Sequence, residues 1–170
     1  MDPLLIVLRI VHVVGGVFWA GGMLFVTHFL EPAVRDSGPD GAKVMQALQR
    51  RRFTDVMPIV AAFTLVSGFW LYLRAYGGAH PGLGASGPEL WLGTGGLLAL
   101  AAFVVGMTLV RPSAARVGAL GVELAQAPPE RKDALAAEVA RLRGRMRLGG
   151  RIVAGLLGIT ILCMAVGRYS

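Results

Sequence analysis

The residues of this sequence that could do chemistry gather around His12, near the start of an uncharged stretch. Residues 12–23, HVVGGVFWAGGM, contain one histidine, four glycines and one tryptophan. In a helix, Gly15, Gly16 and Trp19 lie on the same face as His12. A neutral imidazole is a common ligand of haem iron, and glycines leave room beside it for a flat ring. The spacing therefore predicts a haem site on this helix face.

Two arginines extend this candidate site toward the carboxylates of a haem. Arg9 precedes His12 by one helical turn, and Arg74 lies at the same end of a second apolar stretch. There, Thr64, Ser67 and Arg74 form a polar line along one helix face. Guanidinium groups bind carboxylates in a fork, which suits haem propionates. The candidate cofactor-binding set is His12, Arg9, Gly15, Gly16, Trp19, Ser67 and Arg74, with His12 as the axial iron ligand.

Each of these residues also has a purely structural interpretation. A lone histidine in a membrane helix is commonly bonded to a neighbouring helix, because an unpaired imidazole is costly in lipid. Arg9 and Arg74 can extend along their apolar stems to lipid head groups. Trp19 lies deep in its stretch and can serve packing alone. The residues by themselves leave both interpretations open.

Two further histidines are harder to assign. His28 lies 16 residues beyond His12, which is about 24 Å along a helix and on nearly the opposite face. The two cannot hold one haem, so His28 serves either a second cofactor or the membrane interface. His80 lies in a loop rich in glycine and proline and is either a second axial ligand or a solvated residue. Met23 and Met57 are the other candidates for that second position.

Four uncharged stretches predict the elements that must position these groups. They contain 21, 18, 21 and 16 residues, and the last reaches spanning length if its helix begins near Leu148. A bilayer core needs roughly 20 apolar residues in helical form, and lipid favours helices over an open sheet. We therefore expect one transmembrane domain over residues 1–170, with spans at about 4–30, 54–76, 89–111 and 148–168. The expected fold class is all-α, an integral membrane four-helix bundle.

The distribution of charge predicts how the chain sits in the membrane. Of the 17 basic residues, 14 fall in segments 31–53 and 111–151, and the others are Arg9, Arg74 and Arg168. Basic loops stay on the cytoplasmic side. Both termini are therefore expected on the extracytoplasmic side of a bacterial-type inner membrane. Attraction to anionic lipid accounts for the basic residues, and no nucleic-acid partner is needed.

The connection between the third and fourth spans, about residues 112–147, is predicted to be helical. Pro128 and Pro129 interrupt it, and Leu135, Val139 and Leu142 share one face of the helix that follows. This segment forms either a cytoplasmic helical hairpin that extends the bundle or an arm on the membrane surface, and the hairpin is favoured. Small residues at helical spacing, such as Gly95, predict close helix packing, and exposed seams would allow a homodimer.

Two stretches resemble known membrane families. RIVHVVGGVFWAGGMLF resembles the first span of the copper resistance D (CopD-like) family, in which a histidine is followed by six residues, a tryptophan, any residue and two small residues. It is also similar to the HemJ-type protoporphyrinogen oxidases, which share that opening. RRRFTDVMPIVAAFTLVSGFWLYL resembles the second span of both families. The resemblance covers the whole chain through its four spans and its basic third connection.

The resemblance implies a function as well as a fold. HemJ-type proteins are thought to bind haem b through the first-span histidine, which corresponds to His12. In those proteins a histidine or lysine pair follows the tryptophan that opens the third span, whereas here LGTGG follows Trp91. We therefore expect an integral membrane haem b protein that transfers electrons, or senses redox state or a gas, with a redox partner or quinol.

Three alternatives stay open: a HemJ-like protoporphyrinogen oxidase, a copper-handling permease, and a non-catalytic subunit of a membrane complex. If the protein is an enzyme, the resemblance implies an oxidoreductase. The sequence contains no phosphate loop or catalytic triad, so hydrolysis and phosphoryl transfer are not supported.

Overall fold

The predicted all-helical architecture is confirmed by a computed structural model that describes residues 2–77, 87–167 and 169. Within these residues every element is helical, and four helices are long and apolar enough to cross a membrane. The elements are α1 (Pro3–Phe25), η1 (Val26–Leu30), α2 (Glu31–Asp36), α3 (Pro39–Arg50), α4 (Phe53–Tyr76), α5 (Pro88–Val105), η2 (Gly106–Val110), α6 (Arg111–Gln126) and α7 (Pro129–Val166).

Helix ends follow from local chemistry. The Asp2 carboxylate accepts a hydrogen bond from the Leu4 backbone N–H at 3.0 Å and so caps α1. Gly77 ends α4 with a φ of 62°, a left-handed conformation that glycine adopts without a steric penalty. Pro128 and Pro129 separate α6 from α7. Proline lacks the backbone N–H that would continue α6, but it is tolerated in the first turn of α7.

Three of the long helices extend beyond the spans expected from the sequence. The first runs from Pro3 to Asp36 and the third from Pro88 to Gln126, each through a five-residue π-helical turn, η1 or η2. These turns precede Pro32 and Pro112, and the wider turn relieves the clash between a proline ring and the carbonyl four residues earlier. The fourth, α7, has 38 residues, about 57 Å of unbroken helix, with no boundary near Leu148.

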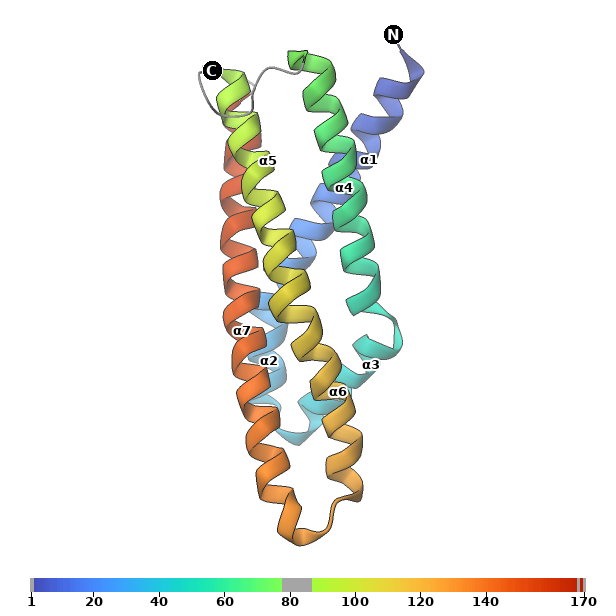
Figure 1. Ribbon diagram of the computed structural model, residues 1–170, viewed down its shortest axis with the longest axis vertical. Helices are drawn as coiled ribbons and strands as arrows, with labels where there is room; N and C mark the ends of the chain where they lie inside the picture. Colours follow the sequence, from blue (N-terminus) through green and yellow to red (C-terminus); the bar gives the residue numbers. More distant parts are fainter. Residues whose placement is uncertain (1, 78–86, 168, 170) are drawn as a thin grey trace.

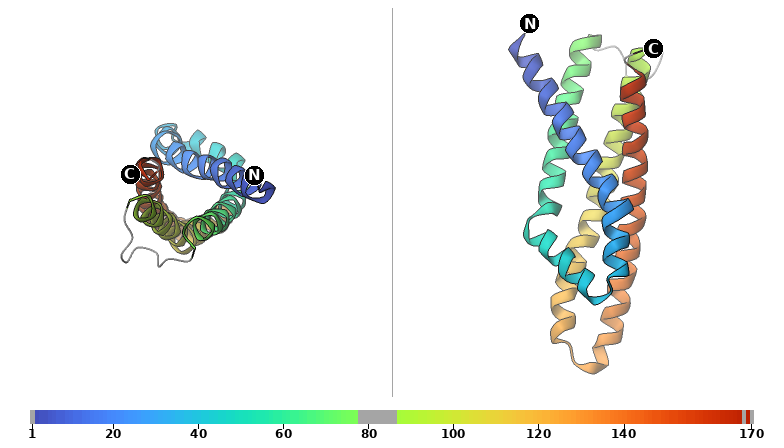
Figure 2. Two further views of the ribbon diagram at one scale, coloured as in Figure 1. Left: turned by 90° about the horizontal axis from the view of Figure 1, so that it is seen from above. Right: turned by 180° about the vertical axis from the view of Figure 1, so that it is seen from behind.

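The four long helices form a ring when seen along the bundle axis (Figure 2). Helix α1 packs mainly against α4, and α7 packs most extensively against α5. Helix α1 begins at the end of the bundle where α7 ends (Figure 1). We call this the terminal end, and the opposite end, which carries most of the charged residues, the hairpin end.

Two buried clusters hold the bundle together. One lies at mid-height and includes Trp19 and Ala20 of α1, Met57 and Ala61 of α4, and Leu157 of α7. The other lies between α6 and the first half of α7 and consists of Leu120, Leu135, Val139 and Leu142. These last four residues make α6 and α7 an antiparallel helical hairpin that continues the bundle, rather than a separate arm.

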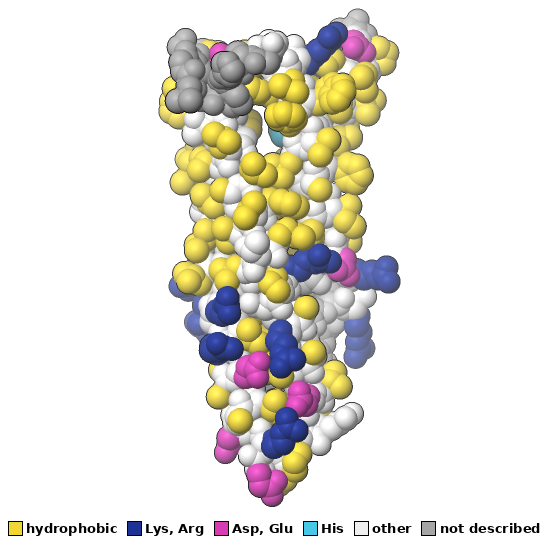
Figure 3. Space-filling model, viewed as in Figure 1, with side chains coloured by type: hydrophobic (Ala, Val, Ile, Leu, Met, Phe, Trp, Pro, Cys, Tyr) yellow, Lys and Arg dark blue, Asp and Glu magenta, His cyan; other side chains and the backbone are white. Residues whose placement is uncertain are grey.

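The surface is divided into an apolar zone and a charged zone (Figure 3). Large apolar side chains such as Val17, Phe63 and Val66 are 63–70% exposed on the spans. Lysine, arginine and acidic side chains gather toward the hairpin end (Figure 3). Exposed apolar surface of this extent is expected where a protein contacts lipid. The structure therefore suggests a multi-pass membrane protein.

Candidate functional site around His12

His12 lies on α1 and reaches across to the backbone of α4. Its Nδ1 lies 2.8 Å from the carbonyl oxygen of Thr64. A carbonyl oxygen can only accept a hydrogen bond, so Nδ1 carries the proton and donates it. In the neutral imidazole, Nε2 is then the unprotonated nitrogen with a free electron pair. No hydrogen bond to Nε2 is present among the described residues.

Gly68 is the residue of α4 that lets the imidazole come this close. A Cβ atom at position 68 would lie 2.5 Å from His12 Cε1 and 2.8 Å from Nδ1. Real Cβ atoms do not approach other atoms so closely, so any side chain at position 68 would displace the ring. The sequence analysis missed Gly68, although the small pair Ser67-Gly68, one turn beyond Thr64, was a visible sign of close packing.

Three of the four glycines of α1, namely Gly15, Gly16 and Gly22, face α4, whereas Gly21 faces open space. A Cβ at Gly15 would lie 2.5 Å from Thr64 Oγ1, and one at Gly22 would lie 2.5 Å from the terminal methyl of Met57. Gly16 is in ordinary contact distance of the Thr64 methyl. These glycines therefore make room for side chains of α4, and helix packing explains Gly15 and Gly22 without a ligand.

The hydroxyl groups of the predicted polar line are used within α4. Ser67 is 2% exposed, and its hydroxyl lies 2.6 Å from the Phe63 carbonyl oxygen and 3.1 Å from that of Thr64. The Thr64 hydroxyl donates to the Val60 carbonyl at 2.8 Å. Serine and threonine commonly bond back to their own helix in this way. Ser67 therefore contributes a small interior side chain rather than a free donor.

The remaining predicted residues are spread along the bundle. Arg9 and Arg74 are exposed near the terminal end, on α1 and α4. Trp19 is 5% exposed and belongs to the mid-height cluster. His28 is exposed, and its Nδ1 lies 3.0 Å from the Leu24 carbonyl of its own helix. His80 lies outside the described residues.

Neither methionine considered as a second axial ligand lies at the level of His12. Met57 packs against Gly22, ten positions along α1 from His12, or about 15 Å of helix. Met23 is one position further still. Two ligands of one iron must both lie within about 2–2.5 Å of it, so neither methionine can share an iron with His12 in this arrangement.

Few residues of α1 and α4 are buried near His12. No residue of α1 before Trp19 is buried, and α4 has no buried residue beyond Ser67. On the facing helix α5, the buried residues nearest the terminal end are Gly93 and Gly95. The space-filling view shows a hollow between α5 and α4 near this end, with a histidine side chain at its back (Figure 3). Gly93 is itself covered by the Tyr72 ring and Gly95 by Cys163 and Met164.

The described residues contain no group of three or more histidine, cysteine or acidic side chains arranged to hold a metal ion. Any metal at His12 would therefore need further ligands, such as the four nitrogens of a porphyrin. Comparisons of the chain with protein-family models, with curated proteins and with solved structures give no match.

Proposed function

We propose that this protein is a membrane haem b protein that transfers electrons or senses redox state or a gas, with His12 as the axial iron ligand through Nε2. One observation carries the proposal: the 2.8 Å contact between His12 Nδ1 and the Thr64 carbonyl. A metal-binding histidine almost always donates its other ring N–H to a carbonyl or carboxylate, which fixes the tautomer and the ring orientation.

Three further features support the proposal. The imidazole is held firmly, because Gly68 lies under the ring and Thr64 bonds it. A histidine side chain is visible in a hollow between α4 and α5 near the terminal end (Figure 3). The chain also resembles the HemJ-type proteins over its first two spans, as described above. Because α4 covers Gly15 and Gly22, the porphyrin in this proposal does not lie over those glycines.

The chain's own residues then have distinct tasks. His12 binds the iron, Gly68 and the Thr64 carbonyl orient the imidazole, and Arg9 and Arg74 pair with the propionates. The exposed apolar side chains around the spans keep the site in lipid and away from bulk water. Haem supplies a one-electron change between ferrous and ferric iron, which suits exchange of electrons with a redox partner or quinol.

A pyridine haemochrome spectrum of purified protein, produced with a haem precursor supplied, tests the proposal. The wild type and His28→Ala are expected to contain haem b, and His12→Ala to lack it. His28 is the matched control because its Nδ1 also bonds a carbonyl, but one within its own helix. In His12→Gly, added imidazole should restore haem binding, which separates loss of the ligand from loss of the fold. A colourless wild type, or haem retained in His12→Ala, ends the proposal.

We further propose that both termini lie outside a bacterial-type inner membrane, with the α6–α7 hairpin in the cytoplasm. The support is the excess of arginine and lysine at the hairpin end, which positive-inside sorting keeps in the cytoplasm. In intact cells, a thiol reagent that cannot cross membranes should label Asp2→Cys and leave Ala127→Cys unlabelled. The reverse pattern would refute this orientation.

A further inference from the structure

A cavity of about 990 Å³ lies toward the hairpin end, between η1, α2 and α3 on one side and α6 and α7 on the other. Its wall begins among the spans at Met23 and Thr27 and continues to Arg143 and Gln126 in the hairpin. The cavity therefore crosses the level at which exposed apolar side chains give way to charged ones (Figure 3). Its volume is at the upper end of the range for ligand sites, about 300–1,000 Å³.

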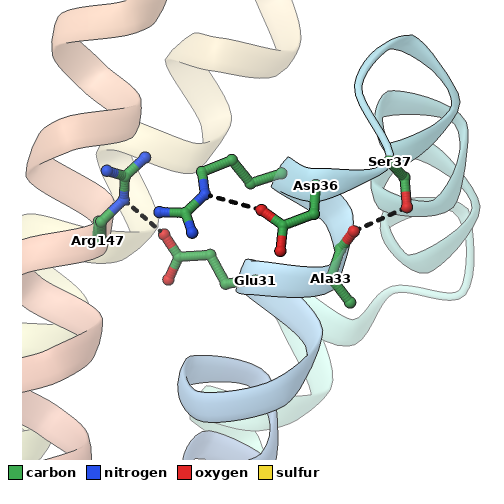
Figure 4. Close-up of polar contacts among 6 residues, drawn as sticks. Glu31, Ala33, Asp36, Ser37 and Arg147 are labelled. Atoms are coloured by element: carbon green, nitrogen blue, oxygen red, sulfur yellow. Dashed lines mark hydrogen bonds and ion pairs between the residues drawn. The ribbon is translucent and has the colours of Figure 1, made fainter.

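The charged part of the wall is strongly positive. Its charged residues are Glu31, Arg35, Arg50, Arg143 and Arg147. Glu31 is the single carboxylate in this set, and it bonds Arg147 across from α2 to α7 at 3.0 Å (Figure 4). Within the part of the chain that the structure describes, no carboxylate lies within 4.0 Å of Arg50 or Arg143. The cavity therefore presents two guanidinium groups without an acidic partner.

Apart from Thr27, Gln46, Gln49 and Gln126, the rest of the wall is lined by apolar residues and glycines. Met23, Met45 and Met146 line it together with valines from η1, η2 and α6. Methionine is flexible and polarisable and fits irregular apolar ligands. A ligand that satisfies both parts of the wall must combine an anionic group with a hydrocarbon chain.

We propose that this cavity binds an anionic phospholipid, with its phosphate at Arg50 and Arg143 and an acyl chain along the methionine-lined wall. The position of the cavity favours a lipid over a small soluble anion, because one end of its apolar lining, at Met23 and Val26, lies among the spans. Basic pockets between membrane helices on the cytoplasmic side are typical sites for acidic lipid head groups. This site is separate from His12 and does not depend on haem.

Native mass spectrometry of delipidated wild-type protein, titrated with phosphatidylglycerol, tests the assignment. The double variant Arg50→Gln/Arg143→Gln should bind it roughly 25-fold more weakly, since each basic group near a lipid head is worth about a fivefold change. The matched control is Arg51→Gln/Arg141→Gln, which removes the same charge from the same two regions outside the cavity lining. An equal loss in the control would show general surface attraction and overturn the site.

Two other ligands distinguish the source of the phosphate. Phosphatidylcholine with the same acyl chains should bind more weakly than phosphatidylglycerol, because its head group has no net negative charge. Glycerol phosphate, which carries the phosphate without a hydrocarbon chain, should not compete at millimolar concentration. Equal binding of phosphatidylcholine or effective competition by glycerol phosphate would each overturn the assignment.

Filling the cavity gives a second test that keeps every arginine. Gly121 lines the cavity, and a Cβ there meets no atom within 4 Å. Gly121→Leu should therefore fold normally and weaken phosphatidylglycerol binding by occupying its space. Gly144→Leu is the control, because position 144 is equally open but does not line the cavity. Unchanged binding in Gly121→Leu would show that the lipid lies elsewhere.

Discussion

In both the α5–α7 pair and the α1–α4 pair a glycine packs against the facing helix. The two pairs differ in the polar side chain that forms the hydrogen bond between the helices. Between α5 and α7, the Thr160 hydroxyl lies 2.9 Å from the Leu156 carbonyl of its own helix and 3.3 Å from the Gly95 carbonyl across the seam. Between α1 and α4, His12 bonds Thr64 through one ring nitrogen, and the other has no partner among the described residues. The hydroxyl of the first seam therefore contacts carbonyl groups of both helices, whereas the imidazole of the second seam bonds through one of its two nitrogens within the described residues.

The two seams also differ in the space that their polar side chains need. A hydrogen bond to the backbone of a neighbouring helix needs only one polar side chain, and the short side chain of Thr160 is sufficient. An imidazole is larger and requires a glycine beneath it, and α4 supplies Gly68. Burying a histidine in a membrane costs more free energy than burying a threonine, and in the proposed function iron ligation through the second ring nitrogen offsets that cost. Three substitutions test these differences between the two seams.

The largest effect is expected from Gly68→Ala. The new Cβ would lie 2.5 Å from His12 Cε1 and displace the imidazole, and loss of such an orienting contact typically lowers metal affinity 10–100-fold. Haem titration followed by absorbance measures the change. Gly21→Ala is the control, because a Cβ there meets no atom within 4 Å. If both variants bind haem like the wild type, the ring position of His12 does not matter for the cofactor.

A smaller effect is expected from Gly95→Val in the other seam. A Cβ at Gly95 lies 3.1 Å from both Cys163 Cβ and Met164 Cε, so two further methyl groups should overpack the contact by about 1–3 kcal/mol. Thermal unfolding in detergent should show a lower midpoint, with haem content per folded protein unchanged. Gly96→Val, where a Cβ meets no atom within 4 Å, is the control. A midpoint equal to that of the control would contradict tight packing at Gly95.

The smallest effect is expected from Thr160→Val. It removes the bond to the Gly95 carbonyl, and hydrogen bonds between membrane helices contribute about 0.6 kcal/mol on average. The matched control is Thr108→Val, since the Thr108 hydroxyl is exposed and bonds only the Val104 carbonyl of its own helix. Unfolding of both variants in detergent measures the difference. A large loss of haem in Thr160→Val would remove the distinction between the two seams.

The sequence was sufficient to predict the four membrane-length helices and the break at Pro128, because uncharged runs and prolines act locally. The interhelical hydrogen bond of His12 is the structural interpretation that the sequence offered, and the role of His12 as an iron ligand stays a prediction. The use of the neighbouring glycines could not be predicted, because a small residue on a helix face does not reveal what fills the space. Thr64 fills it at Gly15 and Met57 at Gly22. Both contacts depend on the pairing of α1 with α4, which no local pattern encodes.

Two other features were beyond prediction for the same reason. Ser67 was predicted to bind a cofactor because its side chain is polar. Its hydroxyl bonds the Phe63 carbonyl of its own helix, so it is not free to bind a ligand. The cavity toward the hairpin end combines residues from α3 with residues of α6 and α7. Arg50 and Arg143 are 93 positions apart in the chain, and only the folded bundle shows that they line one space.

The unbroken course of α7 has a mechanical consequence. Because α7 is one continuous helix from the hairpin tip through the fourth span, a change in the tilt of the span also displaces the hairpin tip. For the part of α7 before Gly150, a tilt of about 10° would move the tip sideways by roughly 6 Å at 1.5 Å of rise per residue. Any protein in contact with that tip would therefore be displaced when the long helices rearrange.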